Sequence, residues 1–436
     1  MSLTATEKPQ SSFYFTSTQT PESLLEQYQE VRSFSEKLCK PLTTEDYVVQ
    51  SMEDVSPTKW HLAHTTWFFE NFVLASQDVP YQWACPEYSY LFNSYYIQAG
   101  ARYSRPRRGL ITRPGVQEVF EYRQRIDERI ITLLKEVNQP ALGELLPIIE
   151  IGIHHEQQHQ ELIVSDIKHV FSFNPLYPVY KETEAGSSQD VPEIAWVSFE
   201  EGMHRIGHDG NGFCFDSEMP CHRHFLESFQ IANRLITNGE YIQFIDDGGY
   251  REPTLWLSEG WHTVEELGWK APLYWREVDG EWHNFTLDGM RKVDPSEPVC
   301  HLSYYEADAF ARWADARLPS EAEWETASAG VPLQGNFVDS ERYHPKPVEA
   351  QESSGLPLQM FGDVWEWTYS PYIGYPGYKP VEGALGEYNG KFMCNQMVLR
   401  GGSCVTSHSH IRRTYRNFFP TSARWQFTGI RLAKDA

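Results

Sequence analysis

The chain has 436 residues, 41% of them hydrophobic and 14% aromatic, which is enough for the packed cores of two or three domains. Its formal net charge of −23 at pH 7 would repel nucleic acid and anionic lipid alike, so small-molecule chemistry is favoured over polyanion binding. There is no run of about 18 apolar residues, and the polar start of the chain lacks the features of a signal peptide. We therefore expect a folded cytoplasmic protein with no nucleic-acid or membrane partner.

Cysteine usage agrees with a reducing compartment. The seven cysteines are an odd number, are scattered along the chain and form no C-x-x-C pair. Neither a disulfide framework nor a zinc ribbon is indicated by this pattern.

Up to about residue 180 the sequence is helical in character. Apolar residues recur there at spacings of three and four, as expected for amphipathic helices. The stretches concerned are residues 20–42, 119–137 and 144–171, and a further helix is expected around residues 60–75. Four such helices can form a bundle, which we assign to residues 17–180 after a polar N-terminal segment at residues 1–16.

The sequence pattern changes after residues 181–192. This stretch is polar and rich in residues that break helices and strands, so we interpret it as a linker. Residues 193–436 contain short apolar runs that alternate with Gly, Pro and Trp, which is typical of a loop-rich α+β domain with few helices. Two helices are predicted there by capping boxes, Ser303 with Glu306 and Ser320 with Glu323.

The segment HEQQH in the last predicted bundle helix contains a candidate metal site. His155 and His159 are four residues apart, so they lie about 40° from each other on a helix and can share one ion. The same letters match the H-E-x-x-H of zinc proteases, in which Glu156 would be the general base. The simplest extended form of that motif requires a third histidine where Ser165 stands, which disfavours a zinc hydrolase.

A third ligand is expected from another helix. Glu161 lies about 240° around the helix from His155, so it cannot easily complete the same site. The segment SPTKWHLAHTTWFFE supplies His61 and His64, and spacing alone does not choose between them. Three histidines on the interior of a bundle would bind a divalent metal and leave coordination positions open.

Longer motifs carry a resemblance to known families. The first half resembles the DinB-like four-helix bundle through H-x3-H-x-E, here His155, His159 and Glu161, with one upstream histidine. The second half resembles the formylglycine-generating-enzyme (sulfatase-modifying-factor) domain, which is C-type-lectin-like, through RLPSEAEWETAS, FGDVWEWTYSPY, LRGGS and FTGIRLA. Joined in this order, the two halves resemble the EgtB-type sulfoxide synthases of ergothioneine biosynthesis. The resemblance covers nearly the whole chain.

This resemblance implies a metal, a reaction and its substrates. The metal would be non-haem iron(II), Fe(II), and the upstream ligand would be His64, with His61 as a neighbour. The reaction would join the sulfur of L-cysteine to the imidazole C2 of hercynine, with O2 as oxidant and hercynylcysteine sulfoxide as product. Glu156 would not act as a base, whereas Gln158 would contact substrate beside the metal.

The segment LFNSYYIQAGARYSRPRRG supplies further candidates. The resemblance implies that Tyr95 and Tyr96 are catalytic, because a positioned phenol can supply a proton and steer the reaction away from simple thiol oxidation. It also implies that Arg102 and Arg105 bind a carboxylate, for which a guanidinium is well suited. Some relatives carry the tyrosine in the second domain instead, which keeps the tyrosines of PYIGYPGY, Tyr372, Tyr375 and Tyr378, as alternatives.

The remaining substrate contacts are expected near the C-terminus. By resemblance to the R-N-aromatic stretch of the family, Asn417, Phe418 and Phe419 would lie beside the trimethylammonium and carboxylate of hercynine. Relatives that use γ-glutamylcysteine have an acidic residue where Phe419 stands, so we predict free L-cysteine as the thiol. Synthases that use γ-glutamylcysteine, histidine (ovothiol synthesis) or a selenosugar are the alternatives.

Two other classes of function are disfavoured. Formylglycine-generating activity relies on a cysteine pair after R-G-G-S, and here only Cys404 follows that motif. A non-enzymatic ligand-binding protein would be expected to lack one of the three metal ligands, and all three are present in the sequence.

Overall fold

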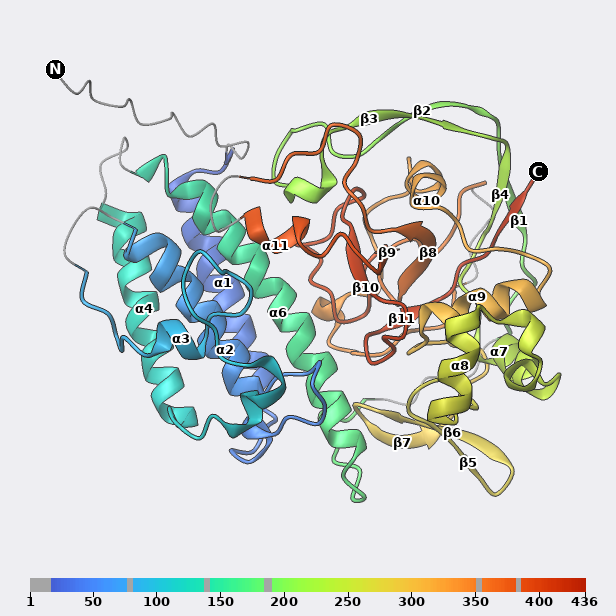
Figure 1. Ribbon diagram of the computed structural model, residues 1–436, viewed down its shortest axis with the longest axis horizontal. Coiled ribbons are helices and arrows are strands. Elements are labelled where there is room, and N and C mark those ends of the chain that lie inside the picture. Colours follow the sequence, from blue (N-terminus) through green and yellow to red (C-terminus); the bar gives the residue numbers. More distant parts are fainter. Residues whose placement is uncertain (1–16, 77–80, 137–141, 184–189, 350–354, 382–385) are drawn as a thin grey trace, which may run out of the picture.

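The computed structural model describes residues 17–76, 81–136, 142–183, 190–349, 355–381 and 386–436. The predicted N-terminal segment, residues 1–16, lies outside this part of the chain, as do residues 184–189 of the predicted linker. Within it, every strand follows residue 190 along the chain, and Figure 1 shows the long helices of residues 17–172 on the left and the strands, with further short helices among them, on the right. The predicted limits of the two domains remain predictions.

The predicted bundle helices are present. They are α1 (Pro21–Cys39), α2 (Thr58–Phe69), α4 (Val116–Glu136) and α6 (Leu146–Ser172). Thr20 caps α1 by accepting a hydrogen bond from the backbone N–H of Ser23. Every residue of α2 is buried, which explains why its apolar and aromatic residues are not confined to one stripe.

Short helical segments complete this half of the chain. They are η1 (Asp46–Val48), the π-helix η2 (Glu70–Leu74), α3 (Tyr88–Leu91) and the 3-10 helix η3 (Arg105–Leu110). η2 directly continues α2, and its Glu70 accepts hydrogen bonds from the hydroxyls of Tyr81 and Tyr122. A π-helical turn is wider than an α-helical turn, so it changes the direction in which the following side chains point.

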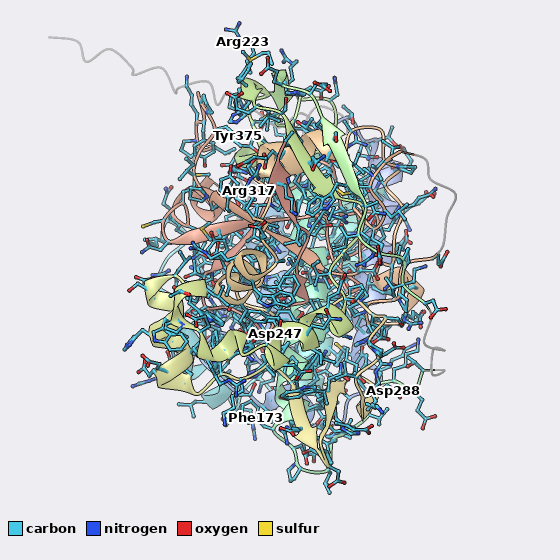
Figure 2. The ribbon with its side chains drawn as sticks, turned by 90° about the vertical axis from the view of Figure 1, so that its right-hand side faces the viewer. Phe173, Arg223, Asp247, Asp288, Arg317 and Tyr375 are labelled. Atoms are coloured by element: carbon cyan, nitrogen blue, oxygen red, sulfur yellow. The ribbon has the colours of Figure 1, made fainter. Side chains whose placement is uncertain are left out.

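Among the described residues, the second half contains four small sheets. Their strands, in sheet order, are β1 (Trp196–Phe199), β4 (Phe229–Ala232) and β12 (Ala433–Asp435); β10 (Asn417–Pro420), β9 (Gln396–Arg400), β8 (Trp365–Pro371) and β11 (Thr428–Gly429); β2 (Gly202–Ile206) and β3 (His222–Leu226); β5 (Trp275–Val278), β6 (Glu281–Thr286) and β7 (Gly289–Lys292). In Figure 2, Arg223 on β3 and Phe173, which directly follows α6, lie toward opposite ends of the molecule.

Both predicted capping boxes are confirmed, and this half has more helices than we predicted. The helices are α7 (Asn238–Asp246), α8 (Ser258–Leu267), α9 (Tyr304–Trp313), α10 (Glu321–Ala327), α11 (Glu387–Gly390) and the 3-10 segments η4 (Asp216–Glu218), η5 (Gly249–Arg251), η6 (Pro253–Leu255) and η7 (Val338–Ser340). Ser303 and Ser320 cap α9 and α10 with Glu306 and Glu323. α7 begins with a third capping box, Thr237 with Glu240, whose signal was present in the sequence and was overlooked.

Helix α6 lies between the bundle and the sheets (Figure 1). Toward the bundle, a Cβ on Gly152 would come within 2.5 Å of the Phe69 ring, so glycine permits the close approach of α6 to the end of α2. Toward the sheets, Val164, Ile167 and Phe171 share one apolar cluster with Val405 and Phe427. The helix is therefore part of the core on both sides, with roughly 1.5–3 kcal/mol gained for each large apolar side chain removed from water.

Two other observations bear on the predicted setting of the protein. All seven cysteines are free thiols within the described residues. None of the helices described there combines the length and apolar character that crossing a bilayer requires.

Candidate active site

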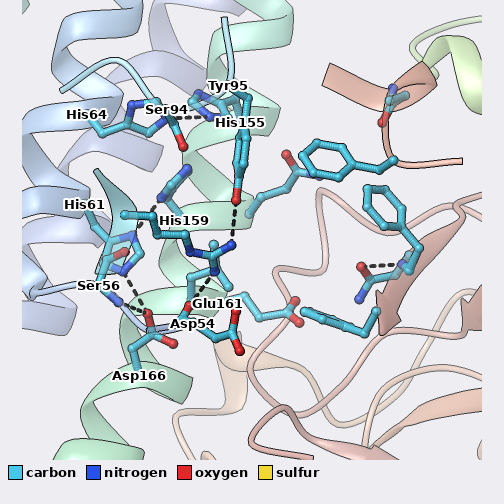
Figure 3. Close-up of a pocket in the computed structure, with 18 of the residues that line it drawn as sticks. Asp54, Ser56, His61, His64, Ser94, Tyr95, His155, His159, Glu161 and Asp166 are labelled. Carbon is cyan, nitrogen blue, oxygen red and sulfur yellow. Dashed lines mark hydrogen bonds and ion pairs between the residues drawn. The ribbon is translucent and has the colours of Figure 1, made fainter. Parts of the chain in front are cut away.

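A cavity lies between α2, α6 and the β8–β10 sheet, and the predicted metal ligands line it (Figure 3). His64 comes from α2, and His155 and His159 come from α6. One ring nitrogen of each lies within 4.8 Å of the others, and the two Nε2 atoms of His64 and His155 are 3.2 Å apart. Among the described residues this is the one cluster of His, Cys, Asp or Glu side chains close enough to hold a metal ion.

The structure distinguishes His64 from His61. The Nδ1 of His64 donates to the Phe92 carbonyl, which leaves Nε2 as the lone-pair nitrogen that faces the other two histidines. Both nitrogens of His61 are already engaged: Nδ1 is 2.8 Å from Nδ1 of His159, and Nε2 is 3.0 Å from Oδ2 of Asp166. His61 therefore has no nitrogen left for a metal.

Burial keeps these imidazoles neutral, which is the form that binds a metal. It lowers the pKa of His155 to about 4 and lowers the pKa values of His64 and His159 well below the usual range. Trp60 stacks on His64 with ring centroids 4.6 Å apart and holds the ligand ring in place. Three neutral, converging nitrogen donors fit a divalent transition metal and leave room for further ligands.

Glu156, the would-be base of a zinc protease, lies outside the residues that line this cavity. Its carboxylate is buried and accepts hydrogen bonds from Arg32 at 2.7 Å, from Arg123 and from Ser35 at 2.7 Å. Burial alone would raise its pKa, but Arg123 and Arg32 outweigh that effect and lower the pKa to about 2. A carboxylate held in this way cannot deliver a water molecule to a metal-bound substrate, so the protease interpretation has no structural support.

Glu161 joins the two halves of the molecule beside the cavity. Its two oxygens accept hydrogen bonds from the Trp365 indole and the Thr406 hydroxyl, each at 2.6 Å. Burial raises the pKa of this carboxyl to about 7, although both hydrogen bonds act in the opposite direction. Both oxygens of Glu161 therefore bind the second domain. The helical angle from His155 predicted that Glu161 would not complete the metal site, which agrees with this position.

Both predicted tyrosines line the cavity. Tyr95 is half-buried, and its oxygen accepts a hydrogen bond of 2.7 Å from Arg105. Tyr96 is buried among Trp67, Phe68 and Phe72.

The alternative tyrosines of the second domain lie outside the cavity lining. Tyr372 stacks on Phe418, with ring centroids 4.1 Å apart. The Tyr378 hydroxyl donates a hydrogen bond to Asp216. Tyr375 contacts His222 on β3 and lies toward the same end of the molecule as Arg223 in Figure 2.

The arginine segment divides into residues that reach the cavity and residues that do not. Arg102 is exposed and lies outside the lining, whereas Arg105 and Arg108 are part of it. Arg108 is buried over the Trp60 ring at 3.3 Å and donates to the hydroxyls of Ser56 and Ser94. Burial lowers its pKa to about 9. A buried guanidinium bonded only to hydroxyls is suited to an anionic ligand.

The opposite wall is aromatic. Asn417, Phe418 and Phe419 on β10 line the cavity as predicted, and Gln158 donates to the Tyr415 hydroxyl at 2.8 Å. The cavity is also lined by Tyr415, Phe392, Trp425 and Asp54, which were not among the residues predicted from the sequence. Tyr415 lies only two residues before Asn417, so proximity to the R-N-aromatic stretch could have suggested it.

Cys404 has no place in this cavity. It is fully buried in the core between α6 and the second domain, and burial raises the pKa of its thiol well above the usual range. A thiol in that state is neither nucleophilic nor accessible, so formylglycine-type chemistry has no support.

Comparisons with known proteins agree with this architecture. The model of the DinB superfamily matches residues 27–163, and that of the sulfatase-modifying factor enzyme 1-like domain matches residues 181–436. Hercynine oxygenase of Mycolicibacterium smegmatis is 33% identical over 313 residues, which cover 65% of this chain and 70% of that protein. Hercynine oxygenase of Mycobacterium tuberculosis is 33% identical over 327 residues, which cover 69% and 76%. Ergothioneine biosynthesis protein 1 of Schizosaccharomyces pombe is 27% identical over 236 residues, which cover 51% and 28%.

The fold and the site together define a class of protein: a DinB-type bundle with a three-histidine cluster, joined to a C-type-lectin-like sulfatase-modifying-factor domain. The predicted fold class is thereby confirmed. Within that class, the chain belongs to the family of EgtB-type hercynine oxygenases and is an oxidoreductase.

Proposed function

We propose that this enzyme joins the sulfur of L-cysteine to C2 of the imidazole of hercynine and forms hercynylcysteine sulfoxide, the sulfoxide synthase step of ergothioneine biosynthesis. One O2 accepts four electrons, two from forming the C–S bond and two from oxidising the sulfur. One oxygen atom remains on sulfur and the other leaves as water. The observation that carries this proposal is that the three histidines, an aromatic wall and two arginines face one cavity.

We assign Fe(II) to His64, His155 and His159. When bound, the metal would bring O2, the thiol and the imidazole together and would supply redox chemistry that protein side chains lack. Neutral imidazole ligands suit this role because they leave the charge of the ion uncompensated, which favours the binding of an anionic thiolate.

Hercynine fits the aromatic wall. Its quaternary ammonium cannot donate a hydrogen bond, so it is best recognised by aromatic faces, here those of Phe418 and Phe419 with Trp425 close by. Gln158 and Asn417 supply amide groups for its polar atoms. The Oε1 of Gln158 is buried without a hydrogen-bond partner among the described residues, which is consistent with a contact that forms when substrate binds.

L-Cysteine fits the charged end of the cavity. Arg105 and Arg108 would bind its carboxylate, and the Nε of each is buried without a partner among the described residues. Asp54, which lines the same region, would bind its ammonium group. Arg102 lies outside the residues that line the cavity, so we do not propose it for this role. Phe419 offers no acceptor for the distant ammonium of γ-glutamylcysteine, and leaving that group unpaired would cost on the order of 1–3 kcal/mol.

The metal assignment is tested by variants of the full-length protein. His64→Ala, His155→Ala and His159→Ala should each lose bound iron and turnover after anaerobic loading, as measured by metal analysis and product formation. His262→Ala, on the exposed face of α8, should retain both. Stoichiometric zinc together with hydrolytic activity that depends on Glu156 would contradict the assignment.

The thiol assignment is tested by steady-state kinetics with hercynine fixed and the thiol varied. L-Cysteine should have a higher kcat/KM than γ-glutamylcysteine, and Asp54→Asn should raise the KM for L-cysteine at least tenfold. A much higher kcat/KM for γ-glutamylcysteine or a selenosugar would overturn the thiol assignment. Turnover of histidine in place of hercynine would overturn the assignment of hercynine as the second substrate.

A further inference from the structure

We propose that Asp166 and His61 are positioning residues that fix the tautomer and ring orientation of His159 through a chain of hydrogen bonds. The chain runs from Asp166 on α6, through His61 on α2, back to His159 on α6, as Figure 3 shows. The inference rests on the proposed function, because it treats His159 as a metal ligand.

The direction of the chain follows from its first member. Oδ2 of Asp166 accepts the backbone N–H of Ser56 at 2.8 Å and lies 3.0 Å from Nε2 of His61. Because a carboxylate only accepts hydrogen bonds, Nε2 of His61 carries the proton, and its Nδ1 has the lone pair. That Nδ1 is 2.8 Å from Nδ1 of His159, which must then be the donor. His159 is thereby left with its lone pair on Nε2, which is the nitrogen that we propose it offers to the metal.

The arrangement of the helices makes this chain rigid. Residues 159 and 166 are seven apart on α6, so they lie on one face about 20° from each other. His61 spans the two from the neighbouring helix and is only 2% exposed, so water does not compete for its nitrogens. The chain therefore holds α2 against α6 at the level of the metal site.

A residue of the second domain also contacts this series of hydrogen bonds. The Trp425 indole donates to Oδ1 of Asp166 at 3.2 Å. Three donors, from Ser56, His61 and Trp425, thus converge on one carboxylate. An asparagine at position 166 would offer one oxygen to these three donors and would leave at least one of them without an acceptor.

The test compares two substitutions of His61 in the full-length protein. His61→Leu removes both nitrogens, whereas the amide of His61→Gln can accept from His159 and donate to Asp166 and so keeps the polarity of the chain. We expect His61→Leu to weaken Co(II) binding by 10- to 100-fold and to change the Co(II) absorption spectrum. His61→Gln should recover most of the affinity and the spectrum.

His169→Leu is the matched control. His169 is also a buried histidine of α6 and is hydrogen-bonded to Ser51 at 2.7 Å, but it takes no part in the series of hydrogen bonds from Asp166 to His159. Its loss should leave Co(II) affinity and spectrum unchanged, whatever its effect on thermal unfolding. The inference is overturned if His61→Leu binds Co(II) as tightly as the unmodified protein, or if His61→Gln is as impaired as His61→Leu. Retention of Co(II) by His159→Ala would instead refute the metal site itself.

Discussion

At the scale of single residues, the adjacent tyrosines have different environments. Tyr95 accepts a hydrogen bond from Arg105, and that bond does not use its own hydroxyl proton. Tyr96 is enclosed by aromatic rings and is only 3% exposed. We propose that a phenol of this pair provides the proton that directs oxidation toward C–S bond formation, and Tyr95, oriented by an arginine, is the better placed.

Replacing each hydroxyl in turn tests this role. Tyr95→Phe should leave iron binding nearly unchanged and should shift products from the sulfoxide toward oxidised thiol by tenfold or more, measured by mass spectrometry against O2 consumed. Tyr96→Phe, matched in chemistry, should have the smaller effect. If both variants keep the ratio of the unmodified enzyme, the proton donor lies elsewhere in the cavity.

Single titratable groups also predict how stability depends on pH. Burial lowers the pKa of His344 to about 4. Its partner Glu297 is buried too, which alone would raise its pKa, but His344 and Arg291 outweigh this and lower the pKa to about 2. Because His344 is neutral above about pH 4, Arg291, which donates to Glu297 at 2.8 Å, is the charged partner of Glu297 near neutral pH.

Both groups bind protons more weakly in the folded state than in the unfolded state. The stability contribution of His344 is therefore complete above an unfolded pKa of about 6.5, and it is lost as the pH falls through the folded value. We expect the metal-free protein to lose on the order of 3 kcal/mol from this group between about pH 6.5 and 4. His344→Gln should flatten that part of the profile in urea unfolding, and His262→Gln, an exposed control, should not. An unchanged profile would contradict the assignment.

At the scale of elements, Glu156 holds three bundle helices together. It lies on α6 and pairs with Arg32 on α1 and Arg123 on α4, and all three side chains are buried. A glutamate that serves this purpose explains why the letters of a protease motif occur in a chain with another chemistry.

Glu156→Gln should destabilise the protein by about 3–5 kcal/mol, because it removes the one buried carboxylate that Arg32 and Arg123 share and leaves them only the more exposed Asp127 and Glu36 as charged partners. Chemical denaturation of the metal-free protein gives this value directly. Glu121→Gln, an exposed position on α4, should change stability by less than about 0.5 kcal/mol. Equal effects of the two substitutions would show that the buried network does not stabilise the bundle.

At the scale of the whole molecule, α6 belongs to both halves. Besides the Glu161 bonds, Gln157 donates to Ser407, and Nζ of Lys168 is 2.6 Å from Nε2 of His301. The apolar cluster that includes Phe171 and Phe427 continues across the same boundary. We therefore expect the bundle and the second domain to unfold as one unit.

Calorimetry tests this expectation. The full chain should show one transition with equal calorimetric and van't Hoff enthalpies. Phe427→Ala, a change in the second domain, should destabilise the bundle helices as well, by about 3–5 kcal/mol in circular dichroism. The exposed Phe225→Ala should not. Two separate transitions would contradict a shared core.

Much of this protein could be predicted from sequence, because the signals are local. Helices α1, α4 and α6 follow from apolar spacing, and α9 and α10 follow from capping boxes within four residues. The i,i+4 histidines of α6 indicate a metal by helical geometry alone. The family motifs then led to residues that do line the cavity, such as Tyr95 and Asn417.

Other properties depend on residues far apart in sequence, and only the tertiary structure shows their physical cause. The family resemblance pointed to His64, but the reason why His61 has no free nitrogen is tertiary: Asp166, 105 residues away, binds its Nε2, and His159 binds its Nδ1. Arg105 and Arg108 rather than Arg102 line the cavity, because they lie three residues apart on the 3-10 helix η3 and so share a face, whereas Arg102 precedes η3 and is exposed. The histidine spacing and the R-x-x-R pattern are the same whichever residue faces inward, so local sequence could not distinguish them. The physical reason is that a side chain's role is determined by the partners that satisfy its polar atoms, and here those partners come from other helices and the second domain.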